Sequence, residues 1–260
     1  MPHILGDRHK STLAHFAASN VLIAFDYDGT LSPFASTPQR ARMRARTRRL
    51  LSAVAERYPC VVISGRARAD IAGRVDGVPI WHVAGNHGAE PWGESETSAS
   101  LVRGWIGQLT VPLAVYKGVV VEDKNYSVTI HYRQARDKRR ALEAIANVAA
   151  RLKGARVLGG SQAVNIVPVG APHKGIALER ARNLLVCDTI IYIGDDDTDE
   201  DAFCVGRPEH LLAIRIGAKR RSRARYWLTS QAEVDALLQM LLSFRPLRHY
   251  RQPAAPAGSR

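Results

Sequence analysis

AFDYDGTLSPF, at residues 24–34, is an apolar segment that delivers two carboxylates, Asp26 and Asp28, with one residue between them. A glycine and Thr30 follow at once. Strand ends meet water and Asp-Gly is a common turn pair, so this stretch alone indicates a turn as readily as a reactive site. The rest of the chain must decide between these two interpretations.

Short apolar segments rich in β-branched residues alternate with helical patterns in the first and last parts of the chain. The expected strands lie at residues 21–25, 60–64, 80–85, 189–197 and 211–217. Helical periodicity fills the intervals between them, as over residues 174–185. This alternation predicts an α/β fold in which crossover helices join parallel strands.

The pattern changes over residues 95–169. There, segments 116–133 and 155–168 have the composition of antiparallel hairpin strands on either side of a helix. We expect this part to form a smaller α/β domain, inserted into a discontinuous core domain made of residues 1–94 and 170–245. The chain would leave the core, build the insert and return.

Basic residues outnumber acidic ones, 37 to 24, and give a formal net charge of +13. This charge permits attraction to nucleic acid or to small anionic substrates. Six arginines crowd residues 39–50, but apolar residues share one helical face there, which predicts an exposed, arginine-coated helix whose further role is open. No aromatic residues interleave with these arginines, which argues against binding of single-stranded nucleic acid. Segment 246–260 is rich in Pro, Ala and Arg without apolar periodicity, so we expect a disordered basic tail.

The three cysteines show no CxxC spacing, which is typical of a protein from a reducing compartment. The N-terminus has no unbroken apolar segment of signal-peptide length, and nowhere is there a stretch of about 18 apolar residues. We therefore expect a cytoplasmic protein without a membrane partner. We expect the protein to be a monomer or a weak oligomer.

Polar residues follow the predicted strands at the edge where an open α/β sheet places its sites. Asp26 and Asp28 follow the first strand, Ser64-Gly-Arg66 follows the second, Lys174 opens a helix, and an acidic run begins at Asp195. Carboxylates from two strand ends, together with a hydroxyl and a lysine, suit a hard cation such as Mg²⁺ and a phosphoryl group. Each feature alone has an ordinary structural explanation. Their conjunction at strand ends favours a phosphatase-type site.

Four motifs carry a resemblance to a known superfamily. DYDGT, SGR, HKG and GDDDTDED, in this order, resemble the motifs of haloacid dehalogenase superfamily phosphatases. Within that superfamily, GNHGAE, VEDK, HYR and GDDDTDEDAF are more similar to the trehalose-6-phosphate phosphatase family. The resemblance covers about residues 20–243. It implies a Rossmann-like core with a parallel sheet and an inserted α/β cap domain.

The resemblance assigns the chemistry to the two neighbouring acids. Asp26 would attack phosphorus and form an aspartyl phosphate, which replaces one difficult displacement by two easier ones. Asp28 would protonate the departing sugar oxygen and then activate the water that hydrolyses the intermediate. Two adjacent carboxylates acquire opposite roles when their surroundings differ, and Mg²⁺ beside Asp26 would supply that difference.

The remaining core residues follow from the same resemblance. Thr30, Ser64 and Lys174 would bind the phosphoryl group. Mg²⁺ would be held by Asp26, by the backbone carbonyl of Asp28 and by Asp195, with Asp199 behind these ligands.

The resemblance also implies a set of substrate-binding residues: Arg66, Asn86 and His87 on the core, and Glu122, Lys124 and Asn165 on the cap. Simpler explanations exist for several of them. Glu122 and Lys124 could form a cross-strand pair, Asn86 and His87 could serve a tight turn, and Arg66 could form a surface ion pair. The family usually has a glutamate where this chain has Asn165, which puts the identity of the sugar in doubt.

The leading hypothesis is thus an Mg²⁺-dependent phosphatase that hydrolyses trehalose 6-phosphate. An alternative within the superfamily is a phosphatase for another phosphorylated sugar or glycoside, such as sucrose phosphate or a glycosylglycerate phosphate. A third possibility, prompted by the +13 charge, is a non-catalytic nucleic-acid-binding or regulatory protein on the same fold.

Overall fold

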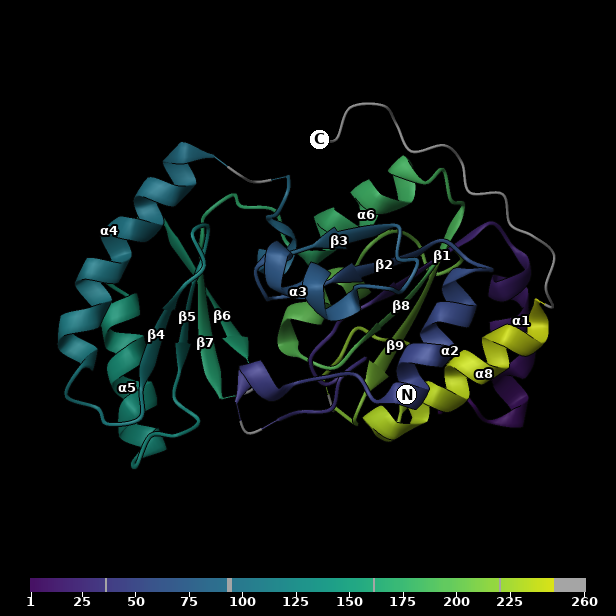
Figure 1. Cartoon of the computed structure of the whole chain (residues 1–260), viewed down its shortest axis with the longest axis horizontal. Helices are drawn as coiled ribbons and strands as arrows, with labels where there is room; N and C mark the ends of the chain where they lie inside the picture. Colours follow the sequence, from purple (N-terminus) through teal and green to yellow (C-terminus); the bar gives the residue numbers. More distant parts are fainter. Residues whose placement is uncertain (36, 93–94, 161, 220, 246–260) are drawn as a thin grey trace.

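The computed structural model describes residues 1–35, 37–92, 95–160, 162–219 and 221–245 of the chain, so the predicted tail at 246–260 lies outside the described residues. Two β-sheets, each with its own helices, lie side by side (Figure 1). The larger sheet is built from the two ends of the chain and the smaller one from its middle.

The larger sheet has six strands in the order β10-β9-β8-β1-β2-β3, all parallel. They are β1 (Val21–Phe25), β2 (Cys60–Ile63), β3 (His82–Ala84), β8 (Thr189–Gly194), β9 (Leu211–Ile216) and β10 (Tyr226–Leu228). The strand order reverses around β1, and the carboxyl ends of β1, β2 and β8 therefore open onto a common crevice. The predicted parallel α/β sheet is confirmed.

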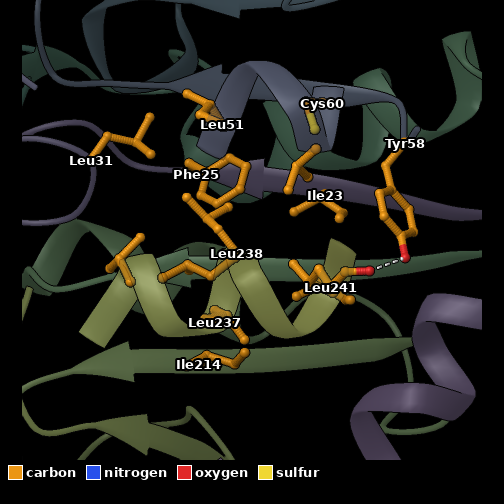
Figure 2. Close-up of a cluster of buried hydrophobic side chains, with 14 of the residues drawn as sticks. Ile23, Phe25, Leu31, Leu51, Tyr58, Cys60, Ile214, Leu237, Leu238 and Leu241 are labelled. Carbon is orange, nitrogen blue, oxygen red and sulfur yellow. Dashed lines mark hydrogen bonds between the residues drawn. The ribbon is translucent and has the colours of Figure 1, made fainter. Parts of the chain in front are cut away.

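Helices cover both faces of this sheet (Figure 1). One face carries α1 (Lys10–Ala18), α2 (Ala45–Ala55), α3 (Arg68–Val75) and α8 (Val234–Phe244); the other carries α6 (Lys174–Leu184) and α7 (Glu200–Phe203). Figure 2 shows Leu237, Leu238 and Leu241 of α8 packed over the strand side chains, with the Tyr58 hydroxyl donating to the Leu241 carbonyl at 2.9 Å. The burial of each such leucine away from water contributes about 1.5–3 kcal/mol to the stability of the fold.

The smaller sheet has four antiparallel strands in the order β4-β5-β7-β6. They are β4 (Val120–Asp123), β5 (Val128–His131), β6 (Ala155–Gly160) and β7 (Ala163–Pro168), and α4 (Glu96–Leu113) and α5 (Lys138–Ala149) cover one face. Val128 and Ile130 of β5 point into this helix-covered core, whereas Thr129 points to the opposite face. Side chains alternate along a strand, so one strand both builds the core and supplies residues to the face that looks toward the larger sheet.

The arginine-rich segment is α-helical only in its second half. The helix α2 begins at Ala45, so Arg40, Arg42 and Arg44 precede it, while Thr47, Leu51 and Val54 of α2 are turned inward. The short 3-10 helices are η1 (Asp7–His9), η2 (Pro38–Arg40), η3 (Asn86–Gly88), η4 (Asp197–Asp199) and η5 (Gln231–Glu233). Ser230 and Glu233 have the spacing of a capping box, but they do not form one. Glu233 instead accepts hydrogen bonds from the Thr229 amide and the His3 ring, because the N-terminal segment packs against this helix start. Within the described ranges, no helix is long and apolar enough to cross a membrane.

Candidate active site

A cavity of about 560 Å³ lies between the strand ends of the larger sheet and the open face of the smaller one. The predicted site residues in its lining are Asp26, Asp28, Arg66, His87, Glu122, Lys124, Asn165 and Lys174. The other predicted residues adjoin this lining: Thr30, Ser64, Asn86, Asp195 and Asp199. Segments that are far apart in the sequence thus meet at one place.

Lys174 forms the floor of this cavity together with two carboxylates. Its Nζ donates to Asp26 Oδ1 and to Asp199 Oδ1, each at 2.7 Å, and all three side chains are buried. Burial opposes the charge of Lys174, but the attraction of Asp199 and Asp26 outweighs it and raises the pKa of the amine. Burial also raises the pKa of Asp26 to about 8, against the opposing effect of Lys174 and with a further rise from Asp199.

Asp195 lies beside Asp26 at the end of β8. Burial, followed by the charges of Asp26 and Asp199, raises the pKa of Asp195 well above its usual range. The Thr30 hydroxyl donates to Asp195 Oδ1 at 3.2 Å. Gly29 has φ +87°, and a Cβ there would stand 2.3 Å from Asp195 Oδ2, so only glycine lets the two loops approach this closely.

Carboxylate oxygens of Asp26, Asp195 and Asp199 lie within 4.8 Å of one another. Asp199, however, uses both of its oxygens: Oδ1 accepts from Lys174 and from the Tyr192 hydroxyl, and Oδ2 accepts from the amides of Asp195 and Asp196. Among the described residues, Asp26 and Asp195 keep lone pairs that accept no hydrogen bond, in an acid-rich setting that is buried at Asp26 and half-buried at Asp195. This donor set fits a hard divalent cation, and Asp199 holds the loop after β8 through two backbone amides.

Asp28 points away from this cluster toward Arg66. The Arg66 guanidinium holds it in a two-point contact, with Nε donating to Oδ2 at 2.6 Å and Nη2 donating to Oδ1 at 2.7 Å. The third nitrogen, Nη1, donates to Asp70 Oδ2 at 2.8 Å. Burial opposes the charge of Arg66, but its bonds to Asp28 outweigh this effect and raise its pKa. The two acids of the opening motif therefore have different partners, as their different predicted roles require.

Ser64, Gly65 and His87 form the wall beside Asp28. The Ser64 hydroxyl accepts a hydrogen bond from the backbone amide of Arg66 at 3.2 Å. A Cβ on Gly65 would stand 2.5 Å from the His87 ring, so the loop and the ring are in close contact. Burial, together with the charges of Lys174 and Lys124, lowers the pKa of His87 well below its usual range. The site therefore holds a neutral imidazole, which can both donate and accept a hydrogen bond.

The smaller sheet contributes the opposite wall. Glu122 Oε2 bonds to the His131 ring at 2.7 Å and lies 3.7 Å from Lys124 Nζ. Burial raises the pKa of Glu122, but the bond to His131 and the charge of Lys124 outweigh this and lower it. The Thr129 hydroxyl donates to Asn165 Oδ1 at 2.8 Å, so these polar groups sit in one row above the floor.

Two side chains that support the site were not among the sequence-based candidates. Tyr192, buried within β8, donates its hydroxyl to Asp199. Arg215, near the carboxyl end of β9, donates to the carbonyls of Asp195 and Asp196 at 2.5 and 3.0 Å. A tyrosine and an arginine within otherwise apolar strand segments were the available signal, since a buried polar group needs a partner.

A model of the trehalose-phosphatase family matches residues 24–232. The chain belongs to the trehalose-phosphatase family. A relative named trehalose-phosphate phosphatase from Mycobacterium avium is 36% identical over 203 residues, covering 72% of this chain and 51% of that protein. A relative of the same name from Mycobacterium marinum is 34% identical over 270 residues, covering 92% of this chain and 68% of that protein. The chain thus spans about half to two thirds of the length of these relatives.

Solved structures show the fold of the family. The C-terminal domain of trehalose-6-phosphate phosphatase from C. albicans superposes with a TM-score of 0.74 at 19% identity, covering 94% of this chain and 97% of that one. A haloacid dehalogenase superfamily phosphatase from Bacteroides thetaiotaomicron, BT1666, superposes with a TM-score of 0.56 at 17% identity, covering 87% and 96%. The predicted haloacid dehalogenase fold and the resemblance to the trehalose-phosphatase family are confirmed.

Proposed function

We propose that this protein is an Mg²⁺-dependent phosphatase that hydrolyses trehalose 6-phosphate to trehalose and phosphate. The observation that carries the proposal is the meeting of Asp26 and Lys174 on the floor of one cavity, with Asp195 and Asp28 beside them. These four residues occupy the positions that the motifs assign to the nucleophile, the lysine, the metal ligand and the acid–base. Membership of the trehalose-phosphatase family gives the substrate class.

In the first step, an Asp26 oxygen attacks phosphorus and the bond from phosphorus to the sugar oxygen breaks. Asp28 gives its proton to the departing oxygen. In the second step, Asp28 takes a proton from water, the water oxygen attacks phosphorus, and the bond from Asp26 to phosphorus breaks. Lys174 holds Asp26 in line through a 2.7 Å bond and adds positive charge beside the phosphoryl oxygens.

Asp26 and Asp195, with the carbonyl of Asp28, are the residues that would hold Mg²⁺. When bound, the ion supplies positive charge that lets a carboxylate approach a phosphate dianion. Among the described residues, one buried lysine faces three clustered acids. Burial raises the pKa of Asp26, and burial followed by the charges of neighbouring carboxylates raises the pKa of Asp195. Thr30 and Ser64 are proposed to donate to the phosphoryl oxygens.

The smaller sheet, within residues 95–169, is proposed to act as the cap that binds the sugar. Glu122, Lys124 and Asn165 line the cavity opposite the floor, and His87 faces them from the core. Asn165 can donate and accept hydrogen bonds, as sugar hydroxyls require, but it lacks the charge of a glutamate. For this reason a different phosphorylated sugar or glycoside remains the second candidate substrate.

Phosphate release from a panel of sugar phosphates tests the proposal. The panel contains trehalose 6-phosphate, sucrose phosphate, a glycosylglycerate phosphate and glucose 6-phosphate, each with and without Mg²⁺. We expect the highest kcat/KM on trehalose 6-phosphate and no turnover after chelation. A higher efficiency on another member would reassign the substrate, and no turnover of any member with any divalent cation would favour a regulatory protein on this fold.

A further inference from the structure

The turn between β4 and β5 docks onto the core at η3. The Ser127 hydroxyl donates to Asn86 Oδ1 at 2.7 Å, and Asn86 Nδ2 donates to the Lys124 carbonyl at 3.1 Å. Asn86 is fully buried and Ser127 is 1% exposed. Both ends of the Asn86 side-chain amide are therefore occupied by the cap turn, and Asn86 is not among the residues that line the cavity.

The same turn also carries a residue that faces the cavity. Lys124 Nζ donates to the Gly65 carbonyl at 3.0 Å, and Glu122 lies on the strand that leads into the turn. Burial lowers the pKa of Lys124, against the opposing charge of Glu122. The position of this pair relative to the phosphate-binding floor is thus set by contacts of the turn with the core.

Asn86 is also tied to the loop after β2. The backbone amide of Asn86 donates to the Arg66 carbonyl at 2.7 Å, and the φ angle of Asn86 is +48°, in the left-handed region. Asparagine tolerates this conformation better than most residues, and its side chain offers a donor and an acceptor together. An aspartate would meet the Lys124 carbonyl with a second acceptor. These requirements select asparagine at this one position.

We propose that Asn86 is a positioning residue, which clamps the cap turn at Ser127 and Lys124 to the Ser64–Arg66 loop and so places the sugar-binding cap residues over the phosphoryl site. The inference rests on the proposed function. In its docked position the turn brings the cap wall with Glu122 and Lys124 and the floor with Asp26 and Lys174 into one cavity. A small phosphate ester needs only the floor, because all of the proposed catalytic groups belong to the core.

Ser127→Ala is the first test, since it removes one hydroxyl and leaves Asn86 Oδ1 without its donor. We expect kcat/KM on trehalose 6-phosphate to fall about tenfold, because a buried acceptor left unpaired weakens the docked state. Turnover of p-nitrophenyl phosphate should stay within about twofold. Thr110→Ala, which removes a hydroxyl from the far helix of the cap, is the matched control and should change neither rate.

A double-mutant cycle with Asn86→Gly isolates the contact. Glycine keeps the left-handed backbone and removes only the side chain. We expect Ser127→Ala to cost little on the Asn86→Gly background, because the pair acts as a unit. Hydrogen exchange gives a readout that needs no substrate: the Lys124 amide, which donates to the Ser127 carbonyl at 3.0 Å, should exchange about tenfold faster in both variants.

Equal losses on the sugar phosphate and the small ester would overturn the inference, because the defect would then lie in the catalytic floor. Unchanged sugar turnover with unchanged exchange would also overturn it. If the wild-type protein hydrolyses no sugar phosphate, the proposed function fails. The exchange measurement then decides the clamp alone, since faster exchange in Ser127→Ala supports the contact and unchanged exchange refutes it.

Discussion

Lys174 is the one lysine that the described residues place among three clustered carboxylates, and this imbalance governs the chemistry of individual residues in the site. Asp199 shares the lysine with Asp26, but it also accepts from Tyr192 and from two backbone amides. Its negative charge is therefore well compensated. Asp26 and Asp195 accept fewer hydrogen bonds from the described residues, and burial, with a further contribution from neighbouring carboxylates, raises their pKa values. A divalent cation would stabilise the charged form of the two residues that the motifs assign to it.

Asp26→Asn should reduce kcat by several orders of magnitude, because an amide cannot attack phosphorus. The same change should stabilise the metal-free protein. The pKa of Asp26 is raised to about 8, so from pH 4 upward the unfolded chain releases this proton while the folded chain retains it, and stability falls as pH rises. Asparagine removes that effect, and we expect about 2 kcal/mol of added stability at pH 7.

Urea unfolding at pH 7 with a chelator measures this gain, and phosphate release measures the loss of activity. Asp188→Asn, at the start of β8 and outside the cavity lining, is the control for removing one acid. Residual activity within about tenfold of the wild type would contradict the assignment of Asp26 as the nucleophile.

At the scale of elements, the loop after β8 is held from two sides. The Asp199 carboxylate accepts hydrogen bonds from the backbone amides of this loop. Arg215 of β9 donates to the backbone carbonyls of the loop and forms an ion pair with Glu200 at 2.8 Å. We expect Arg215→Met to raise the Mg²⁺ concentration for half-maximal activity by about tenfold, because residues behind a metal ligand set its orientation.

At saturating Mg²⁺, kcat of Arg215→Met should change less than about threefold. The rise in melting temperature on adding Mg²⁺ gives an independent readout and should shrink in this variant. Arg225→Met, at a more exposed position beside β10, serves as the control. An unchanged Mg²⁺ requirement in Arg215→Met would show that the loop does not need these hydrogen bonds.

His82 on the edge strand β3 gives the stability of the fold a pH dependence. Its ring lies 4.7 Å from that of Trp92, centroid to centroid, and its Nε2 is buried with no hydrogen-bond partner among the described residues. Burial, with a smaller effect of Arg68, lowers the pKa of His82 to about 4. The unfolded chain binds a proton below about pH 6.5, whereas the folded chain does so only near pH 4.

Stability should therefore fall as pH drops from 6.5 to 4, and His82→Phe should remove part of that fall. Across this pH range, we expect the free energy of unfolding to fall by about 1.5 kcal/mol more in the wild type than in His82→Phe, a figure that allows for the partly exposed ring. Urea unfolding at pH 7 and pH 4.5 measures it. Parallel pH profiles for the two proteins would show that His82 has the same pKa in the folded and the unfolded chain.

At the scale of the whole molecule, two sheets divide the work. The floor of the cavity comes from the parallel sheet, and the wall with Glu122 and Lys124 comes from the antiparallel one. We expect Glu122→Ala and Lys124→Ala to lower kcat/KM on trehalose 6-phosphate by about 100-fold and to leave p-nitrophenyl phosphate turnover within about threefold. Only the sugar can use binding energy from the cap.

Arg139→Ala removes an exposed charge from α5, on the helix-covered side of the cap, and is the control for these two changes. Comparable losses on both esters would mean that the cap does not distinguish the sugar. Asn165→Glu belongs to the same series. A gain on trehalose 6-phosphate would support that substrate, and a loss on a sugar phosphate that the wild type prefers would exclude it.

The sequence by itself determined the parallel sheet and the convergence of Asp26, Ser64, Lys174 and Asp195. Apolar strands that alternate with helices leave few topologies, and parallel strands bring their carboxyl ends to one edge. The helical periodicity that places Thr47, Leu51 and Val54 inward also explains why Arg46 and Arg49 of α2 face water. These features depend on local patterns of residues, which are visible in the amino-acid sequence.

Only the tertiary structure decided how those residues are partnered. Asn86 clamps the cap turn, Arg66 holds Asp28, and Arg215 supports the loop after β8. In these three contacts the two partners are separated by 20 to 38 residues, and each contact depends on how loops from different strands pack. The missing capping box at Ser230 has the same cause, since the N-terminal His3 bonds to the Glu233 side chain. Long-range hydrogen bonds of this kind leave no periodic trace in the sequence, because they follow from the geometry of the assembled fold.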